Sequence, residues 1–177
     1  MRPYHTRPMS DGWSKLHDID PWADARTRVD FAIPLKDFPR LVSQLADPAG
    51  DARGHVQFGR QDGIAVADVE VEAMAHLICQ RCLAPLEWPV ESRGRVAMVE
   101  EGEDTAALPA ELETILAPQR RLSVRDLVEE ELLLALPVVP LHDAPHCADV
   151  AAVAAAAPAA PEGRQKPFAQ LGELFKR

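Results

Sequence analysis

The sequence predicts an α+β fold in which an antiparallel β-sheet is packed by one long apolar helix. The sheet is indicated by residues 55–99, where apolar and polar side chains alternate as in strands with one buried face. The helix is indicated by a leucine-rich run that begins after Ser123, a residue suited to cap a helix start, and stops at Pro137. A chain of 177 residues with 47% hydrophobic residues can bury one such core but hardly two.

Shifts in composition divide the chain into four parts. Residues 1–28 show no helical or strand period and are expected to form an irregular N-terminal arm. Residues 29–149 carry the alternating and leucine-rich runs, which predicts the single α+β domain. Residues 150–165 are rich in alanine and proline, as linkers are. Residues 166–177 (KPFAQLGELFKR) space their apolar side chains like a short amphipathic C-terminal helix. Both arms are expected to be flexible.

The first part of the domain is predicted to hold a strand and then a helix. The run FAIPL from Phe31 is apolar but contains a proline, which suits an edge strand. Four apolar side chains between residues 38 and 45 then recur at helical spacing, so we expect a helix from near Asp37. The stretch DPAGDARG after them ends that helix.

The rest of the sheet is expected up to residue 99. The runs HVQFGR and IAVADVEVEAMAHLIC, joined by the turn signal at residues 61–63, predict a hairpin of two antiparallel strands. A third strand is predicted in LEWPVESRGRVAMVEE, broken near Pro89 or Gly94. Residues 100–119 are acidic and contain two prolines, which predicts a long, partly mobile loop. The helix that begins near Ser123 is then expected to pack across the sheet.

The charge of the chain disfavours broad binding of nucleic acid. Acidic side chains outnumber basic ones, 28 to 19, and the formal net charge of -9 repels a polyanion over most of the surface. The same charge favours a basic protein partner. Local cationic positions are usually solvated surface, but a contact with RNA or a partner stays open for Arg120, Arg121, Arg125, Lys166 and the neighbouring Phe168.

Other classes of protein find little support in the sequence. The basic N-terminus has no apolar run behind it that could serve as a signal-peptide core, and no stretch has the roughly 20 apolar residues of a membrane span. A cytoplasmic protein is therefore expected. Metalloprotease, phosphate-loop, nucleophile-elbow and dinucleotide-binding motifs are wanting as well, so the sequence predicts no enzyme and no small-molecule substrate.

Three cysteines and a histidine form a candidate zinc site. Cys79 and Cys82 form a C-x-x-C pair that can bind one tetrahedral ion, and Cys147 with His142 can complete four ligands. We prefer His142 over His146, because the adjacent side chains of His146 and Cys147 point apart. The alternative is a reduced pair in a bend with a buried third cysteine. Redox activity is disfavoured, since strands rather than a helix are expected to flank the pair.

The glutamates of the predicted helix point in different directions. Residues 129–131 are consecutive, so they cannot act as one chelating cluster, and Glu131 alone is expected to face the apolar stripe. A buried carboxylate needs a partner, for which we consider Arg81. The alternative is a solvated helix flank.

Two blocks of sequence resemble one known family. They are LICQRCLAPLEWPV and DLVEEELLLALPVVPLHDAPHC, followed at a distance by KPFAQLGELFKR, and they are similar to the YceD family of bacterial large ribosomal RNA subunit accumulation proteins. Many relatives have further cysteines after the last block, and this chain lacks them. The positions that match the family's motifs are Cys79, Arg81, Cys82, Glu130, Glu131, Pro137, Pro140, His142 and Cys147.

The resemblance implies a role in the synthesis, processing or stability of 23S ribosomal RNA without a catalytic centre. The leading hypothesis is a non-enzymatic ribosome-biogenesis accessory that binds a large-subunit precursor, a ribosomal protein or an rRNA processing factor. One alternative is a module that binds RNA directly. Another is a zinc-dependent hydrolase or nuclease, in which three protein ligands and a water would hold the ion.

Overall fold

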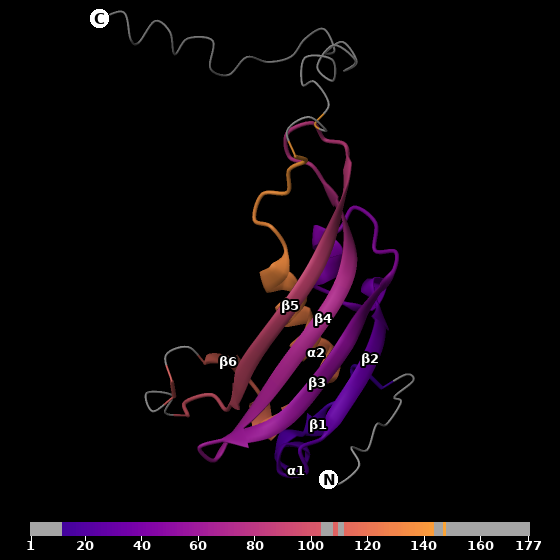
Figure 1. Ribbon diagram of the computed structural model, residues 1–177. Coiled ribbons are helices and arrows are strands. Elements are labelled where there is room, and N and C mark those ends of the chain that lie inside the picture. The colour runs from indigo at the N-terminus through magenta and orange to yellow at the C-terminus, as the bar shows by residue number, and fades with distance from the viewer. Residues whose placement is uncertain (1–11, 104–107, 110–111, 144–146, 148–177) are drawn as a thin grey trace, which may run out of the picture.

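The computed structural model describes residues 12–103, 108–109, 112–143 and 147, which form a mixed sheet with few helices (Figure 1). Five strands pair in the order β2-β3-β4-β5-β6. The first four are antiparallel, and β6 is parallel to β5. Their bounds are Arg28–Pro34 (β2), Asp51–Gln61 (β3), Ile64–Ile78 (β4), Pro85–Val99 (β5) and Glu113–Leu116 (β6).

Shorter elements surround this sheet. Strand β1 pairs with β7 in a separate two-stranded sheet. No helix among the described residues is long and apolar enough to cross a membrane. The remaining elements are β1 (His17–Asp18), β7 (Arg121–Leu122), the helices α1 (Ile19–Asp24) and α2 (Val124–Ala135), and the 3-10 turns η1 (Leu35–Asp37), η2 (Leu41–Gln44) and η3 (Pro118–Arg120).

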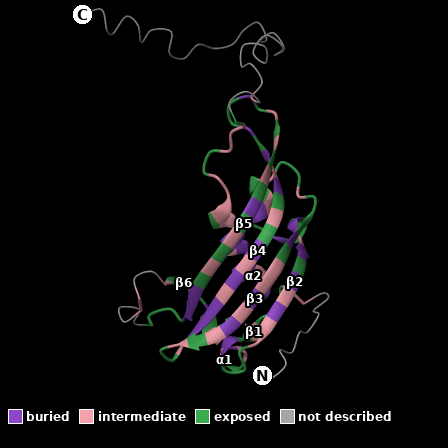
Figure 2. Cartoon of the chain, viewed as in Figure 1, coloured by how far each residue is buried: buried purple, intermediate pink, exposed green. Residues whose placement is uncertain are grey.

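The predicted hairpin between residues 55 and 78 is confirmed. Asp62 and Gly63 form its turn with φ of 51° and 84°, the two left-handed positions that a tight turn between twisted strands requires. Buried and exposed residues recur along β3 and β4 (Figure 2), as the alternation in the sequence predicts. The next strand, β5, is continuous, so the predicted break near Pro89 or Gly94 is wrong. Because β6 pairs only with Val96–Val99, Pro89 lies where β5 is an edge strand, which tolerates proline.

The helix predicted after Ser123 is present between the expected start and stop, but it buries two glutamates and exposes Leu134, so it is less apolar than expected. The Ser123 hydroxyl accepts a hydrogen bond from the Asp126 amide (3.0 Å) at its start. Its end at Ala135 follows from Pro137, which forces the preceding residue into an extended conformation. Twelve residues make about three turns. The helix contacts β4 and β5 and buries Leu127 and Leu132 in the core, together with two glutamates.

The expectation of an irregular chain is wrong for residues 17–24. Helix α1 buries Ile19 and Ala23, and the Trp22 ring packs edge-on against Phe58 of β3 with centroids 5.0 Å apart. These contacts join residues that are far apart in the sequence, so no local period in the sequence predicts them. The more distal residues of the expected arm lie outside the described part.

The helix expected from near Asp37 is also wrong, because two 3-10 turns stand in its place. Pro39 disfavours helical backbone at the residue before it, and Phe38 is accordingly extended at φ -98° and ψ 101°. Phe38 and Leu41 nevertheless remain buried in the core. The apolar spacing therefore predicted burial correctly and the backbone incorrectly.

The loop expected at residues 100–119 contains a fifth strand of the sheet. Strand β6 pairs with Val96–Val99, and the Ala117 amide donates to the Val99 carbonyl (2.8 Å). An acidic, proline-containing stretch gave no sign of this parallel pairing. The linker at 150–165 and the helix at 166–177 lie outside the described residues, and with the four-part division of the chain they stay predictions.

Candidate functional site

The Cys79–Cys82 pair forms the tip of the long β4–β5 hairpin. Strand β4 ends at Ile78, and β5 begins at Pro85. The turn is held by hydrogen bonds from the Leu83 amide to the Cys79 carbonyl (2.9 Å) and from the Cys79 amide to the Ala84 carbonyl (3.0 Å). Leu83 has φ of 60°, a left-handed conformation that is unfavourable for a bulky side chain. The tip is therefore a tight turn with an unfavourable backbone conformation at Leu83, which the surrounding contacts must maintain.

The chain that leaves α2 returns to this tip. Beyond Pro137 it extends along the hairpin until the Pro140 carbonyl accepts a hydrogen bond from the Gln80 amide (2.9 Å). The His142 amide then donates to the Cys79 sulfur (3.4 Å). The two prolines predicted from the sequence thus lead His142 to the cysteine turn.

All four predicted metal ligands come together there. The Sγ atoms of Cys79 and Cys147 are 3.8 Å apart, and the Cys82 Sγ is 3.3 Å from Nδ1 of His142. The four donor atoms lie within 4.8 Å of one another. Cys79 and Cys82 are buried, whereas His142 and Cys147 are partly exposed. His146, the ligand that we did not prefer, lies outside the described residues.

The protein environment changes the protonation of this Cys3His cluster. Burial raises the pKa of the Cys79 thiol, but amides of Cys82, His142 and Arg81 that point at the sulfur outweigh burial and bring the pKa down to about 5. The Cys82 sulfur raises the pKa of His142. Burial, with the neighbouring sulfurs of Cys82 and Cys79, raises the pKa of Cys147 to about 11. The cluster thus supports thiolate character at Cys79.

The donor set suits a tetrahedral ion. Zinc in proteins binds sulfur at about 2.3 Å and imidazole nitrogen at about 2.0 Å, so neighbouring donors of a tetrahedron lie about 3.5–3.8 Å apart. The separations of 3.8 Å and 3.3 Å here are close to those values. Three thiols and one imidazole are also the soft donors that zinc prefers. The Cys3His cluster is therefore a possible zinc site.

Two glutamates of α2 are buried, not one: Glu131 lies against β5 and Glu129 against η2. Glu129 accepts hydrogen bonds from the backbone amides of Arg40 (2.7 Å) and Leu41 (3.1 Å), and the Arg40 side chain bridges it to Glu130. The expectation that Glu131 alone faces inward is therefore wrong. Glu129 is buried because its carboxylate caps the η2 turn, which spacing along α2 does not reveal.

The partner proposed for Glu131 is also wrong. Its carboxylate accepts a hydrogen bond from the Ser92 hydroxyl of β5 (2.9 Å) and lies against Gly94, where a side chain would collide with it. Arg81 is exposed in the hairpin turn, and within the described part of the chain no ion pair joins it to Glu131. The pair fails because the turn lies at the end of the hairpin, whereas Glu131 faces the middle of β5.

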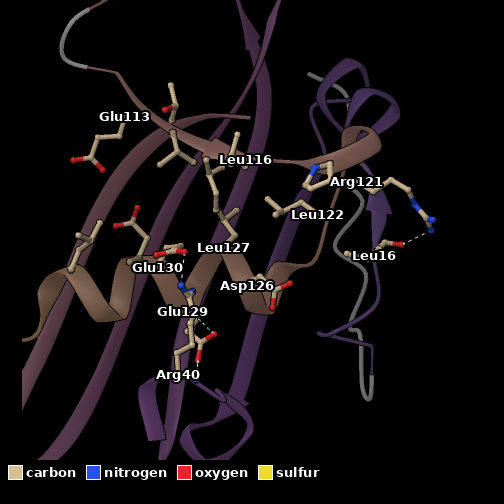
Figure 3. Close-up of a pocket in the computed structure, with 16 residues that line it drawn as sticks. Leu16, Arg40, Glu113, Leu116, Arg121, Leu122, Asp126, Leu127, Glu129 and Glu130 are labelled. Carbon is tan, nitrogen blue, oxygen red and sulfur yellow. Dashed lines mark hydrogen bonds and ion pairs between the residues drawn. The ribbon is translucent and has the colours of Figure 1, made fainter. Parts of the chain in front are cut away.

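A cavity of about 660 Å³ lies between β6 and α2 (Figure 3). Its apolar surface includes Leu116 and Leu134, which are 59% and 68% exposed. Carboxylates surround that surface, and Arg40 and Arg121 also reach it. The acidic residues that line it are Glu113, Asp126, Glu129, Glu130 and Glu131. A second cavity, of about 550 Å³, lies beside the hairpin tip and includes Leu83, Pro137 and Pro140.

The arginines considered for RNA contact are engaged within the chain. Arg120 donates to Asp20 at 2.6 Å and 3.0 Å, Arg121 pairs with Asp18 at 3.4 Å, and Arg125 pairs with Asp126 at 3.0 Å. The pKa of Asp20 falls to about 2, mainly because of the bond from Arg120. These cations are thus partly neutralised by neighbouring carboxylates. Lys166 and Phe168 lie outside the described residues.

Comparison with known proteins gives one family. Residues 67–175, more than half of the chain, match the family model described as "Large ribosomal RNA subunit accumulation protein YceD". A Haemophilus influenzae protein of that name is 29% identical over 163 residues, which covers 88% of this chain and 93% of the relative. Among solved structures there is no match. The matched range contains the hairpin tip, α2 and His142.

Proposed function

Because the chain belongs to the YceD family of large ribosomal RNA subunit accumulation proteins, we propose that it is a cytoplasmic, non-enzymatic accessory of 23S ribosomal RNA synthesis, processing or stability. The family's description names accumulation of an RNA and no reaction. The relative in Haemophilus influenzae carries the same description over nearly its whole length, which supports the same general role in ribosome biogenesis.

The observation that carries the mechanism is the cavity between β6 and α2. It combines exposed leucines at 116 and 134 with the exposed Glu113 and the partly exposed Asp126 and Glu130, whereas the carboxylates of Glu129 and Glu131 are buried and bonded within the chain. Apolar contacts with complementary charge around them are features of specific protein interfaces. An amphipathic segment with basic side chains fits this surface best.

We therefore propose a basic protein as the direct partner, either a ribosomal protein of the large-subunit precursor or an rRNA processing factor. The net charge of -9 favours such a partner over RNA at long range. The ion pairs of Arg120, Arg121 and Arg125 support the same choice, because phosphates would have to compete with Asp20, Asp18 and Asp126.

The role is tested in cells that carry this gene. Deleting the gene is expected to lower the amount of 23S relative to 16S ribosomal RNA, and the restored gene should return the ratio to normal. Equal ratios with and without the gene, under every growth condition tried, would contradict the proposed role.

The partner surface is tested with matched charge variants. Leu134→Asp alters the cavity, whereas Val138→Asp alters a 94% exposed side chain outside it, and neither position is buried. After affinity purification from nuclease-treated lysates, we expect basic ribosomal or processing proteins with the parent and Val138→Asp, but at least about tenfold less with Leu134→Asp, equivalent to a loss of about 1.4 kcal/mol. Equal recovery by both variants argues against this surface.

Direct RNA binding is the second candidate and has its own signature. Purified protein would bind 23S fragments with an affinity that falls steeply with salt, and removing an arginine would reduce that dependence. Absence of binding at low salt removes this candidate. Strong salt-dependent binding would instead replace the protein-partner proposal.

A further inference from the structure

We propose that Cys79, Cys82, His142 and Cys147 bind one zinc ion as a closed structural centre, which fastens the chain beyond α2 to the tip of the β4–β5 hairpin. The inference does not rest on the proposed function, since it concerns what holds the fold together. It rests on the geometry of the donors, the bonds that orient them and the scarcity of other contacts at the tip.

The donors form two pairs from two distant segments. Cys79 and Cys82 belong to the hairpin turn, while His142 and Cys147 arrive more than fifty residues later along the chain. Two of the pairs formed across the segments lie close to the separation of tetrahedral neighbours, at 3.8 Å for the sulfurs of Cys79 and Cys147 and 3.3 Å for the Cys82 sulfur and the His142 nitrogen. One ion between them would therefore need little movement of the protein.

The histidine is oriented for binding through Nδ1. Its other ring nitrogen, Nε2, lies 2.9 Å from the Pro85 carbonyl oxygen. A hydrogen on Nε2 donates to that carbonyl and leaves the Nδ1 lone pair directed at the cysteines. Histidine ligands of metals characteristically donate their other N–H to a carbonyl or carboxylate in this way.

Backbone amides prepare the sulfur of Cys79. The His142 amide donates to it from the incoming segment at 3.4 Å. Such N–H groups stabilise a thiolate without taking up a ligand position. The same contact joins the two segments directly beside the proposed ion.

Four protein donors make the centre structural. Catalytic zinc keeps three protein ligands and an open position for water, whereas structural zinc has four. The four donors here, all within 4.8 Å of one another, satisfy tetrahedral coordination. The centre thus differs from the one that a zinc-dependent hydrolase or nuclease needs.

The tip needs such a cross-link, because apolar burial there is small. Leu83, Val138 and Val139 are 68%, 94% and 52% exposed. Leu83 also holds an unfavourable left-handed conformation, which the surrounding structure must maintain. Binding of a metal to a preformed set of ligands supplies stabilisation of that kind.

The direct test uses the full chain and needs no mutation. Protein purified without added metal or chelator is expected to contain about one zinc per chain, the stoichiometry of a single four-ligand site. Replacing zinc with cobalt should give the intense visible bands of tetrahedral Co²⁺ and a thiolate charge-transfer band. Protein that is fully reduced yet binds neither zinc nor cobalt, or gives the weak bands of octahedral cobalt, overturns the proposal.

Ligand identity is tested with matched pairs. Cys82→Ala and His142→Ala are expected to weaken zinc binding at least about a hundredfold, since the protein ligands of a structural site are all required. His146→Ala and His76→Ala serve as controls and should leave binding within about twofold, since neither is in the proposed set. Loss of zinc from His146→Ala but not from His142→Ala would overturn the assignment of the fourth ligand. Because a ligand variant can also fold poorly, its cobalt titration is compared with circular dichroism of the same sample.

Discussion

Two regions of this molecule attach the C-terminal part of the described chain to the sheet in different ways. One is the body, formed by the five-stranded sheet and α2, and the other is the tip of the β4–β5 hairpin at residues 79–84. In the body, α2 lies on β4 and β5, and its buried Leu127 and Leu132 belong to the core. At the tip, the chain beyond Pro137 meets the hairpin through the Cys3His cluster, and Leu83 and Val138 are largely exposed. Polar groups are buried in both regions, but only the body surrounds them with a large apolar core.

The difference teaches where this fold can rely on its own side chains. The carboxylates of Glu129 and Glu131 are satisfied by amides and a hydroxyl of the protein, so they need nothing from outside. The thiols at the tip face one another and an imidazole. Thiols form only weak hydrogen bonds with one another, but thiols and imidazole together can bind a common ion. The body should therefore be stable by itself, and the tip should depend on metal.

The largest effect is expected from the core of the body. Leu127→Ala leaves a cavity under α2 and should lower the free energy of unfolding by about 3 kcal/mol. Leu134→Ala on the same helix removes a side chain that is 68% exposed and should cost less than about 0.5 kcal/mol. Denaturant unfolding of the two variants measures the contrast. Equal losses would show that α2 does not carry the core as described.

A smaller effect is expected from the buried carboxylate that caps η2. Glu129→Leu leaves the amides of Arg40 and Leu41 without their acceptor and should cost about 2 kcal/mol. Glu130→Leu removes an exposed ion pair with Arg40 and should cost less than about 1 kcal/mol. Thermal or denaturant unfolding of both proteins provides the comparison. A cost for Glu130→Leu as large as that for Glu129→Leu would place the stabilisation in the surface pair instead.

The contact of Glu131 with β5 can be tested by adding one methyl group. In Gly94→Ala the new Cβ meets the Glu131 carboxylate, which is buried and has little room to move, so about 1–2 kcal/mol should be lost. Gly59→Ala on β3 is the control, because a Cβ there has no neighbour within 4 Å. Unfolding midpoints measure both. If Gly59→Ala is equally destabilising, strand flexibility rather than Glu131 explains the result.

The ion pairs of Asp20 in α1 should make the free energy of unfolding depend modestly on pH in the acid range. Arg120 and Arg60 lower the pKa of Asp20 from 3.8 to about 2. Its contribution is therefore fully present above pH 4 and is lost as the pH falls towards 2. Asp20→Asn should cost about 1 kcal/mol at neutral pH, because partial exposure screens the pairs, and the cost should shrink below pH 4. Unfolding curves at several pH values measure it, and a difference independent of pH would contradict the assignment.

The smallest effect on global stability is expected from removing zinc, which should loosen the hairpin tip alone. Removing zinc with a chelator should leave the stability of the body within about 0.5 kcal/mol, because the core is remote from the tip. Amide hydrogen exchange should nevertheless accelerate at residues 79–84 and 141–143, with no change in β2 and β3. Acceleration throughout the sheet would show that the two regions do not differ as proposed.

Several features of the fold were accessible from local chemistry. Ser123 and Pro137 mark the ends of α2, and Asp62-Gly63 marks the hairpin, because each residue acts on its own backbone or that of its neighbours. The effect of Pro39 on Phe38 was equally local, and it would have excluded helical backbone at Phe38. The cysteine and histidine set was recognisable because a tetrahedral ion selects donor types that few other roles combine.

Other features depended on groups that meet only after folding. The parallel pairing of β6 with β5, the burial of α1 and the capping of η2 by Glu129 each join residues far apart in sequence. Glu131 was expected to face the apolar stripe, and it is buried, yet its partner is Ser92 rather than Arg81, since position along β5 decides which polar group it can reach. Caps and turns act through their immediate chemistry and can be predicted from the chain, as can the residue types of a candidate metal site. Which distant residues become partners depends on which elements pack against one another, and only the tertiary structure decides that packing.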